Sequence, residues 1–290
     1  MSLTRIVALA LAMAATLTPP ALAQSGPARG SLVIVGGGRV GDEIYDRFID
    51  LAGGVDAPIV VIPTAGENDE EYNEFYGGLT GFRRAGAGKL TVLHTRDRNE
   101  ANSEAFARTI REARGVWFEG GRQWRLADSY LNTRVHEELT ALLARGGVIG
   151  GSSAGATILG DYLVRGDTRD NTTMMGDHTQ GFAFLKGVGI DQHVLKRNRQ
   201  FDMIEVIEAM PELLGIAIDE STAIVVQGDR FQVLGASYAL IYDSRRMLDS
   251  GGQFYFLAPG DRYDLKTRQA TRPSTAQEPI GRVIEKAWPR

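Results

Sequence analysis

Short apolar runs alternate with longer amphipathic stretches over the first half of the chain. The runs with few polar positions are 32–35, 59–62, 90–93, 116–118 and 148–149. Between them, apolar residues recur at helical spacing in a stretch through Ile44, Phe48 and Leu51, and in 70–84, 101–113, 123–131 and 135–143. Strands without alternation are buried on both faces, so this order predicts parallel βαβ units with helices on both sides of the sheet.

The pattern changes after about residue 215. Short runs at 223–226, 231–234, 239–242 and 254–257 predict strands, and Gly228-Asp229 predicts a hairpin turn between two of them. We therefore expect one α/β domain over residues 31–265, with a β-rich C-terminal part. Residues 266–290 are rich in Thr, Arg, Pro and Gln and are predicted to form a C-terminal tail.

The first 23 residues have the pattern of a Sec-type signal peptide. Arg5 is followed by an apolar stretch over 6–17, and Ala21-Leu22-Ala23 forms a small-residue cleavage signal. The alternative is an uncleaved anchor or an N-terminal helix. We predict cleavage after Ala23, a Gly/Ser/Pro linker over 24–30, and export to the periplasm or the medium. The chain has no cysteine, so disulfides do not stabilise it there.

Composition excludes several classes of protein. The 290 residues are 43% hydrophobic and carry a net charge of −4, which suits one globular domain with a sizeable core. Lysine and arginine are scattered, so no footprint for nucleic acid is expected. No apolar run reaches the roughly 20 residues that a membrane span needs. No His, Cys or carboxylate cluster has the spacing of a zinc site, and no cofactor is expected.

Residues 150–156, Gly-Gly-Ser-Ser-Ala-Gly-Ala, contain the pattern most suggestive of chemistry. Gly151, Ser153 and Gly155 form G-x-S-x-G between a predicted strand and a predicted helix. In that arrangement the serine lies on a sharp turn with its hydroxyl exposed above the sheet. The helix N-terminus that follows offers unpaired N–H groups to an oxyanion. This segment predicts a nucleophile for acyl chemistry.

A serine nucleophile needs a base, and the base needs an orienting acid. The chain has four histidines: His94, His136, His178 and His193. His193 follows Asp191-Gln192 and precedes two arginines, which predicts either a catalytic site or a solvated loop. Asp219 and Glu220 lie between two predicted strands. They are either turn residues or the source of the acid that orients the histidine. An α/β-hydrolase places its histidine last, whereas the order Ser153, His193, Glu220 fits another scaffold.

A different interpretation comes from residues 36–41, Gly-Gly-Gly-Arg-Val-Gly, which match G-x-G-x-x-G after a strand. Such a loop can bind a dinucleotide. The next strand ends in Pro63, however, and no acidic residue is placed there for a ribose. A nucleotide-binding protein, or a non-catalytic binding protein on the same fold, therefore remains as the alternative class.

The ordered set of motifs resembles peptidase family S51, the family of the cyanophycinases and α-aspartyl dipeptidases. The similarity runs from about residue 32 to 243. It rests on the first strand with its glycine turn, on Phe118-Glu119-Gly120-Gly121-Arg122-Gln123, on the elbow, on Asp191-Gln192-His193 with Arg197 and Arg199, and on the segment 218–223.

The resemblance implies a flavodoxin-like three-layer α/β fold with a mostly parallel sheet. It also implies a catalytic triad in which Ser153 is the nucleophile, His193 the general base and Glu220 the orienting carboxylate. It implies oxyanion contacts from the N–H groups of Ala154, Gly120 and Gly121. It also implies a substrate pocket lined by Gln123, Asp191, Gln192, Arg197 and Arg199. The substrate of cyanophycinases is cyanophycin, an aspartate backbone with arginine on its β-carboxyls. Because the family often forms dimers, a homodimer is implied as well.

Two positions depart from the family pattern. Arg122 stands where the family has aspartate in Gly-Gly-Asp-Gln, and Asp202 stands where cyanophycinases have a further arginine. Both changes reverse a charge beside the pocket. We therefore expect an exported serine peptidase that cleaves cyanophycin or another β-aspartyl peptide, or an S51 aspartyl dipeptidase with a different substrate.

Overall fold

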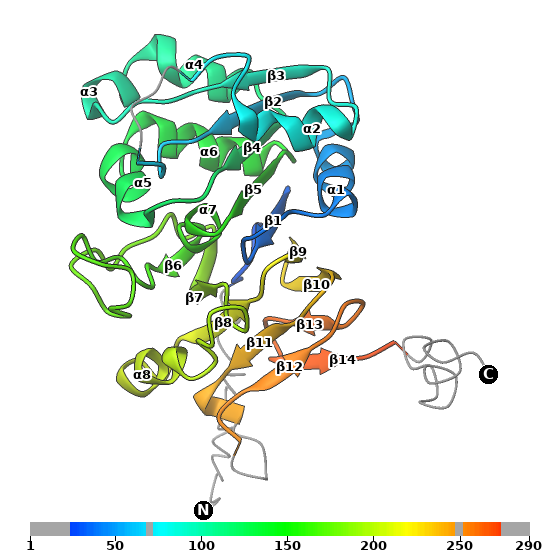
Figure 1. Cartoon of the computed structure of the whole chain (residues 1–290), viewed down its shortest axis with the longest axis vertical. Coiled ribbons are helices and arrows are strands. Elements are labelled where there is room, and N and C mark those ends of the chain that lie inside the picture. Colours follow the sequence, from blue (N-terminus) through cyan, green and yellow to red (C-terminus); the bar gives the residue numbers. More distant parts are fainter. Residues whose placement is uncertain (1–23, 68–71, 247–251, 274–290) are drawn as a thin grey trace, which may run out of the picture.

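Two β-sheets and the helices between and around them make up the computed structural model (Figure 1). The structure describes residues 24–67, 72–246 and 252–273. The predicted signal peptide lies outside these residues. Among the described residues, no helix is long and apolar enough to cross a membrane.

The larger sheet has nine strands in the order β14-β13-β10-β9-β1-β5-β4-β2-β3. Its parallel half consists of β1 (Ser31–Val35), β5 (Val148–Ser152), β4 (Gly115–Phe118), β2 (Pro58–Ile62) and β3 (Lys89–Val92). Its antiparallel half consists of β9 (Thr222–Gln227), β10 (Arg230–Gly235), β13 (Arg262–Asp264) and β14 (Gln269–Thr271). The carboxyl ends of the parallel strands share one edge, which is where ligands bind in such sheets.

A smaller sheet of five strands has the order β12-β11-β8-β7-β6. It is built from β12 (Tyr255–Leu257), β11 (Ala239–Tyr242), β8 (Leu214–Ile218), β7 (Leu185–Gln192) and β6 (Gly160–Tyr162). Strands β7 and β8 are parallel, with Gln192 opposite Ile218. The residues that follow these two strands therefore emerge side by side.

Helices cover both faces of the larger sheet. The helices on and around it are α1 (Asp42–Ala52), α2 (Thr80–Arg84), α3 (Arg98–Ala101), α4 (Glu104–Glu112), α5 (Gln123–Tyr130), α6 (Arg134–Ala144) and α7 (Ala154–Thr157), with a 3-10 turn at Gly77–Leu79. Helix α8 (Asp202–Ala209) packs on the smaller sheet instead, and a second 3-10 turn lies at Ser244–Arg246. Side chains alternate along the strands: Val33 and Val35 pack with α1, whereas Leu32 and Ile34 face the opposite core. This alternation produces two separate apolar cores.

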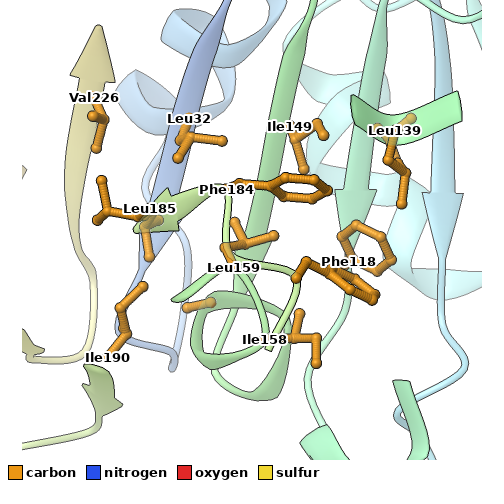
Figure 2. Packing of buried hydrophobic residues seen from close by; sticks show 14 of the residues in the cluster. Leu32, Phe118, Leu139, Ile149, Ile158, Leu159, Phe184, Leu185, Ile190 and Val226 are labelled. Carbon is orange, nitrogen blue, oxygen red and sulfur yellow. The ribbon is translucent and has the colours of Figure 1, made fainter. Parts of the chain in front are cut away.

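The larger core joins the two sheets (Figure 2). Ile149 of β5 and Phe118 of β4 face Ile158 and Leu159, which follow the serine turn, and Leu185 and Ile190 of β7. The smaller sheet is thus fixed against the same strands that carry the serine. Each Å² of apolar surface removed from water contributes about 25 cal/mol to the free energy of folding, so this contact between the sheets is a main source of stability.

The α/β fold class is confirmed, and the predicted strands of the larger sheet are present. Two predicted helices differ. The predicted helix over 70–84 begins at residues outside those described; within 72–84 the structure has a 3-10 turn at Gly77–Leu79 and α2 from Thr80, and the poor helix propensity of Gly77 and Gly78 explains why the α-helix is short. In place of one helix over 101–113, Ser103 begins a new helix, accepting a hydrogen bond from the Phe106 amide at 3.2 Å.

Segments at both described ends pack on the domain. In the predicted linker, the amides of Ser25 and Gly26 donate to the Asp229 carboxylate at 2.8 and 3.1 Å. In the predicted tail, Gln269–Thr271 forms the edge strand β14 against β13. The folded domain therefore extends past residue 265, the predicted boundary.

Candidate active site

Ser153 occupies the turn between β5 and α7. Its backbone has φ 57° and ψ −115°, a conformation that costs a non-glycine residue about 1–3 kcal/mol. The two flanking glycines make this turn possible. A Cβ on Gly151 would lie 2.3 Å from the Gly155 carbonyl oxygen, and a Cβ on Gly155 would lie 2.1 Å from that of Phe118. The G-x-S-x-G pattern thus forms the strained elbow that the sequence predicts.

His193 reaches the serine from the smaller sheet. It directly follows β7, and its amide donates to the Gly36 carbonyl at 2.8 Å. Its Nε2 lies 2.9 Å from Ser153 Oγ, so the hydroxyl can donate to a neutral imidazole. A proton acceptor is therefore in place for the serine.

Glu220 completes a chain of three side chains. Its Oε1 lies 2.6 Å from His193 Nδ1, and its side chain is 25% exposed. The neighbouring Asp219 has a different environment: it accepts from the amides of Leu195 and Lys196 and from the Ser237 hydroxyl. Asp219 therefore fixes the turn after the histidine, while Glu220 is the carboxylate in contact with the imidazole.

Sheet register explains how these three side chains meet. Val35 of β1 is opposite Ser152 of β5, so the ends of both strands meet at the same edge. Strand β9 runs antiparallel to β1 and begins there, with Ala223 opposite Val35, which places Glu220 at that edge. Strand β7 delivers His193 beside the residues that follow β8.

The glycine loop after β1 accommodates the histidine and the glutamate. A Cβ on Gly37, whose φ is +112°, would lie 2.2 Å from His193 Cε1. A Cβ on Gly38 would lie 2.5 Å from Glu220 Oε2. These glycines, which also match a dinucleotide fingerprint, are thus required by close approach of the imidazole and the carboxylate.

The imidazole is buried, and burial is the main cause that lowers the pKa of His193 below 6.5. The hydrogen bond that the imidazole donates to Glu220 opposes this lowering of the pKa, whereas the positive charges of Arg197 and Arg199 add to it. A lowered pKa keeps His193 neutral at neutral pH. It is therefore in the protonation state of a general base.

The residues predicted to hold an oxyanion lie beside the serine. Helix α7 begins at Ala154, whose amide therefore has no carbonyl partner within the helix. On the other side, a Cβ on Gly120 would lie 3.2 Å from Ser153 Cβ and 3.7 Å from Oγ. Gly121 follows with φ +143°. Ala154 and Gly120 thus flank the serine, and the Gly120 amide also donates a hydrogen bond to Glu119.

The five residues predicted to line the substrate pocket have different environments. Gln123 and Asp191 are buried, and the Gln123 amide donates to the carbonyls of Val164 and Arg165. Gln192 and Arg199 are buried together, with Arg199 Nη1 3.3 Å from Gln192 Oε1. Arg197 is exposed. Only Arg197 has open access to solvent, and Asp191 is covered by another residue.

That residue is Arg165, which sequence reasoning missed. Its guanidinium forms a fork on Asp191, with Nε and Nη2 at 2.8 and 2.9 Å from the two carboxylate oxygens, and also reaches Asp202. Asp202, one of the two departures from the family pattern, is thus paired. Arg122, the other departure, donates to the carbonyls of Asp167 and Asp170 and holds the loop between β6 and β7.

Glu119 is a second residue that the sequence did not reveal. It follows β4 directly and precedes Gly120, on the side where Tyr45 and Tyr76 lie. Burial raises the pKa of Glu119 to about 7.

The other three histidines lie apart from the serine. His94 is half-buried, with Nδ1 2.9 Å from Thr64 Oγ1, and His136 Nε2 lies 3.1 Å from the Phe182 carbonyl oxygen. His136 is half-buried as well. His178 is bound by Asp128 at 2.8 Å and Asp177 at 3.1 Å. Within the described ranges, no group of three His or carboxylate residues could hold a metal ion.

Comparisons with known proteins agree with this geometry. A family model described as Peptidase family S51 matches residues 32–234. A cyanophycinase of Geminocystis herdmanii is 30% identical over 262 residues, covering 83% of this chain and 96% of the relative. A cyanophycinase of Trichormus variabilis is 29% identical over 260 residues, covering 82% and 86%.

Solved structures give the same result for the fold. The crystal structure of a peptidase from an acI-B1 Actinobacterium superposes with a TM-score of 0.65 at 25% identity, covering 83% of this chain and 98% of that one. A putative peptidase E from Listeria monocytogenes has a TM-score of 0.51 at 18% identity, covering 72% and 100%. The second likeness concerns the fold alone.

Proposed function

Because the chain belongs to peptidase family S51, we propose that it is a serine peptidase in which Ser153 is the nucleophile, His193 the general base and Glu220 the orienting acid. The observation that carries this proposal is the continuous chain of contacts from Ser153 Oγ to His193 Nε2 at 2.9 Å and from His193 Nδ1 to Glu220 Oε1 at 2.6 Å. Nucleophile, base and orienting acid are the three parts that acyl transfer by a serine requires.

The proposed reaction begins when Ser153 Oγ attacks the substrate carbonyl and His193 Nε2 takes the hydroxyl proton. Glu220 holds the imidazole with its proton on Nδ1 and stabilises the imidazolium that forms. The amide of Ala154 and an amide of Gly120 or Gly121 would hold the oxyanion. One such donor is worth about 3–4 kcal/mol. His193 then protonates the leaving amine, and water, deprotonated by His193, releases the acyl group.

The proposed substrate is cyanophycin or another β-aspartyl-linked peptide. The named relatives support this class, since the cyanophycinases cover most of the chain. Arg197 and Arg199 are the groups proposed to bind a substrate carboxylate, and Gln123, Asp191 and Gln192 shape the pocket around them. Asp191 would act through Arg165, which covers it.

A substrate panel tests the proposed function. The purified protein is incubated with cyanophycin and with α- and β-aspartyl dipeptides, and released amines are identified by mass spectrometry. Cleavage of at least one β-aspartyl bond, lost in Ser153→Ala, is the expected result. Cleavage of α-aspartyl bonds alone would assign an aspartyl dipeptidase, and no cleavage would favour a non-catalytic binding protein.

We also propose that the protein is exported and that the mature chain begins at Gln24, because Ala21-Leu22-Ala23 follows an apolar stretch. Expression of the full chain in a Gram-negative host, followed by intact-mass analysis of the periplasmic fraction, tests this. A homodimer is proposed as well, which light scattering on the purified protein measures.

A further inference from the structure

Arg165 is an arginine buried inside a pair of carboxylates. Its side chain is only 1% exposed, and so is that of Asp191, whereas Asp202 is 36% exposed. Nε and Nη2 form the fork on Asp191, and Nη2 also lies 2.6 Å from Asp202 Oδ2. Two parallel N–H···O bonds with a second carboxylate alongside make a complete binding site for a guanidinium.

The remaining donors of Arg165 are also engaged. Nη1 donates to the carbonyls of Asn171 and Thr172, each at 3.2 Å. Burying such a group is expensive, and a buried ion pair is weak evidence for stability, since apolar side chains of equal volume often serve as well. The backbone at Arg165 has φ +56°, which adds strain. An arrangement with these costs calls for a role beyond filling space.

The cluster continues into the active site. Asp191 precedes the general base by two residues on β7, and its Oδ1 accepts from the Gln192 amide at 2.9 Å. The Gln192 side chain accepts from Arg199, which interacts electrostatically with Arg165, Asp191 and Asp202. The charge of Arg199 also acts on His193. A group bound between Asp191 and Asp202 would therefore lie next to the reacting centre.

We propose that Arg165 occupies, from within the chain, a guanidinium subsite formed by Asp191 and Asp202, and thereby excludes the arginine side chain of a peptide from this position. The inference rests on the proposed function and narrows the proposed class of substrates. The preferred substrates are β-aspartyl peptides whose second residue is neutral or acidic.

The charge of the surroundings supports this substrate class. With both carboxylates taken by Arg165, Arg197 and Arg199 form no ion pair with a carboxylate in the described ranges. Near His193, therefore, Arg197 and Arg199 are two positive charges that no described carboxylate pairs, while Glu220 is engaged by the imidazole. Such unpaired guanidinium groups attract a substrate carboxylate and repel a substrate guanidinium.

Replacing Arg165 by glycine tests the proposal, because glycine tolerates the positive φ and removes the whole side chain. The free molecule n-propylguanidinium has the structure of that side chain, and n-butylammonium carries the same charge without the fork. Binding of each to the variant is measured by calorimetry, and kcat/KM is measured for β-aspartyl-arginine and β-aspartyl-norleucine.

The proposal expects n-propylguanidinium, and not n-butylammonium, to bind Arg165→Gly, with no binding to the wild type. The ratio of kcat/KM for the arginine peptide to that for the norleucine peptide should rise at least about tenfold, as expected when charged hydrogen bonds are gained. Asp202→Asn in the same background should weaken the binding. The matched control is Arg169→Gly, since Arg169 lies on the same loop and pairs with Asp167 but is 80% exposed.

Other outcomes overturn the proposal. A folded Arg165→Gly that binds no guanidinium and keeps the wild-type ratio would show that Arg165 only anchors the loop. If the variant does not fold, it is refolded with each cation: recovery with n-propylguanidinium alone supports the subsite, and recovery with neither refutes it. If the wild type cleaves no β-aspartyl peptide, the proposed function fails, while the binding measurement still decides whether the subsite exists.

Discussion

Glu220 Oε1 lies 2.6 Å from His193 Nδ1, although the two residues come from different loops and are 27 positions apart. The contact holds the imidazole with Nε2 facing Ser153. Glu220→Gln would keep the shape but favour the wrong tautomer. We expect kcat to fall by about 10²- to 10⁴-fold with little change in KM, as for orienting acids in other triads. Steady-state kinetics measures this, with Asp219→Asn for comparison: it should lower stability instead, because Asp219 fixes the turn.

The glycine at position 37 provides a test of the same geometry from the opposite side. Gly37→Ala would place a Cβ 2.2 Å from His193 Cε1 and should displace the imidazole, lowering kcat at least about tenfold. Gly53→Ala is the matched control, since Gly53 has φ +110° but nothing within 4 Å of the added Cβ. Both variants carry similar backbone strain, so equal losses of activity would argue against displacement of His193.

The pH profile reports on the base. Because burial lowers the pKa of His193 below 6.5, kcat/KM should rise with pH through a midpoint below 6.5, where the imidazole loses its proton. Arg197→Gln removes a positive charge that acts on His193, so the midpoint should move upward. Lys196→Gln removes an exposed neighbouring charge and should leave it unchanged. A midpoint above 6.5 in the wild type would contradict this account.

The raised pKa of Glu119 predicts how the stability of the folded protein depends on pH. Burial raises its pKa from 4.5 to about 7, so between these values the folded protein holds a proton that the unfolded chain has released. Stability should therefore fall as the pH rises from about 4.5 to 7, by up to about 3 kcal/mol. Glu119→Gln should remove this fall, whereas Glu208→Gln, at an exposed helix position, should not. Urea unfolding at pH 5 and pH 8 measures the difference, and a parallel loss in Glu119→Gln would assign it to other groups.

Local patterns explain how much of the fold could be predicted. The elbow at Ser153 was predictable because its flanking glycines and the strand before it are adjacent in sequence. Strands β6 and β7 of the smaller sheet were not predicted, since β6 has three residues and β7 contains Lys186, Gly187 and Gly189, which interrupt its apolar pattern. Strand β14 was predicted as part of the tail, because its three residues are all exposed and show no apolar pattern.

Long-range contacts explain what the sequence did not reveal about the site. Arg165 meets Asp191 and Asp202, which are 26 and 37 positions away, and no local pattern predicts such a pairing. The same holds for the use of the glycine loop: residues 36–38 match a nucleotide fingerprint, whereas their fit to His193 and Glu220 depends on how the sheets are placed. Resemblance to the family supplied the triad as a hypothesis, and the register of β1, β5, β7 and β9 accounts for its geometry.

The central claim is that Ser153 is the nucleophile. A fluorophosphonate reagent should add one adduct to the purified protein, located on Ser153 by peptide mass spectrometry, with loss of peptide hydrolysis in step with labelling. Ser152→Ala, a change at the buried neighbouring serine that ends β5, should still be labelled, whereas Ser153→Ala and His193→Ala should not. An adduct on another residue, or undiminished hydrolysis in Ser153→Ala, would contradict the claim.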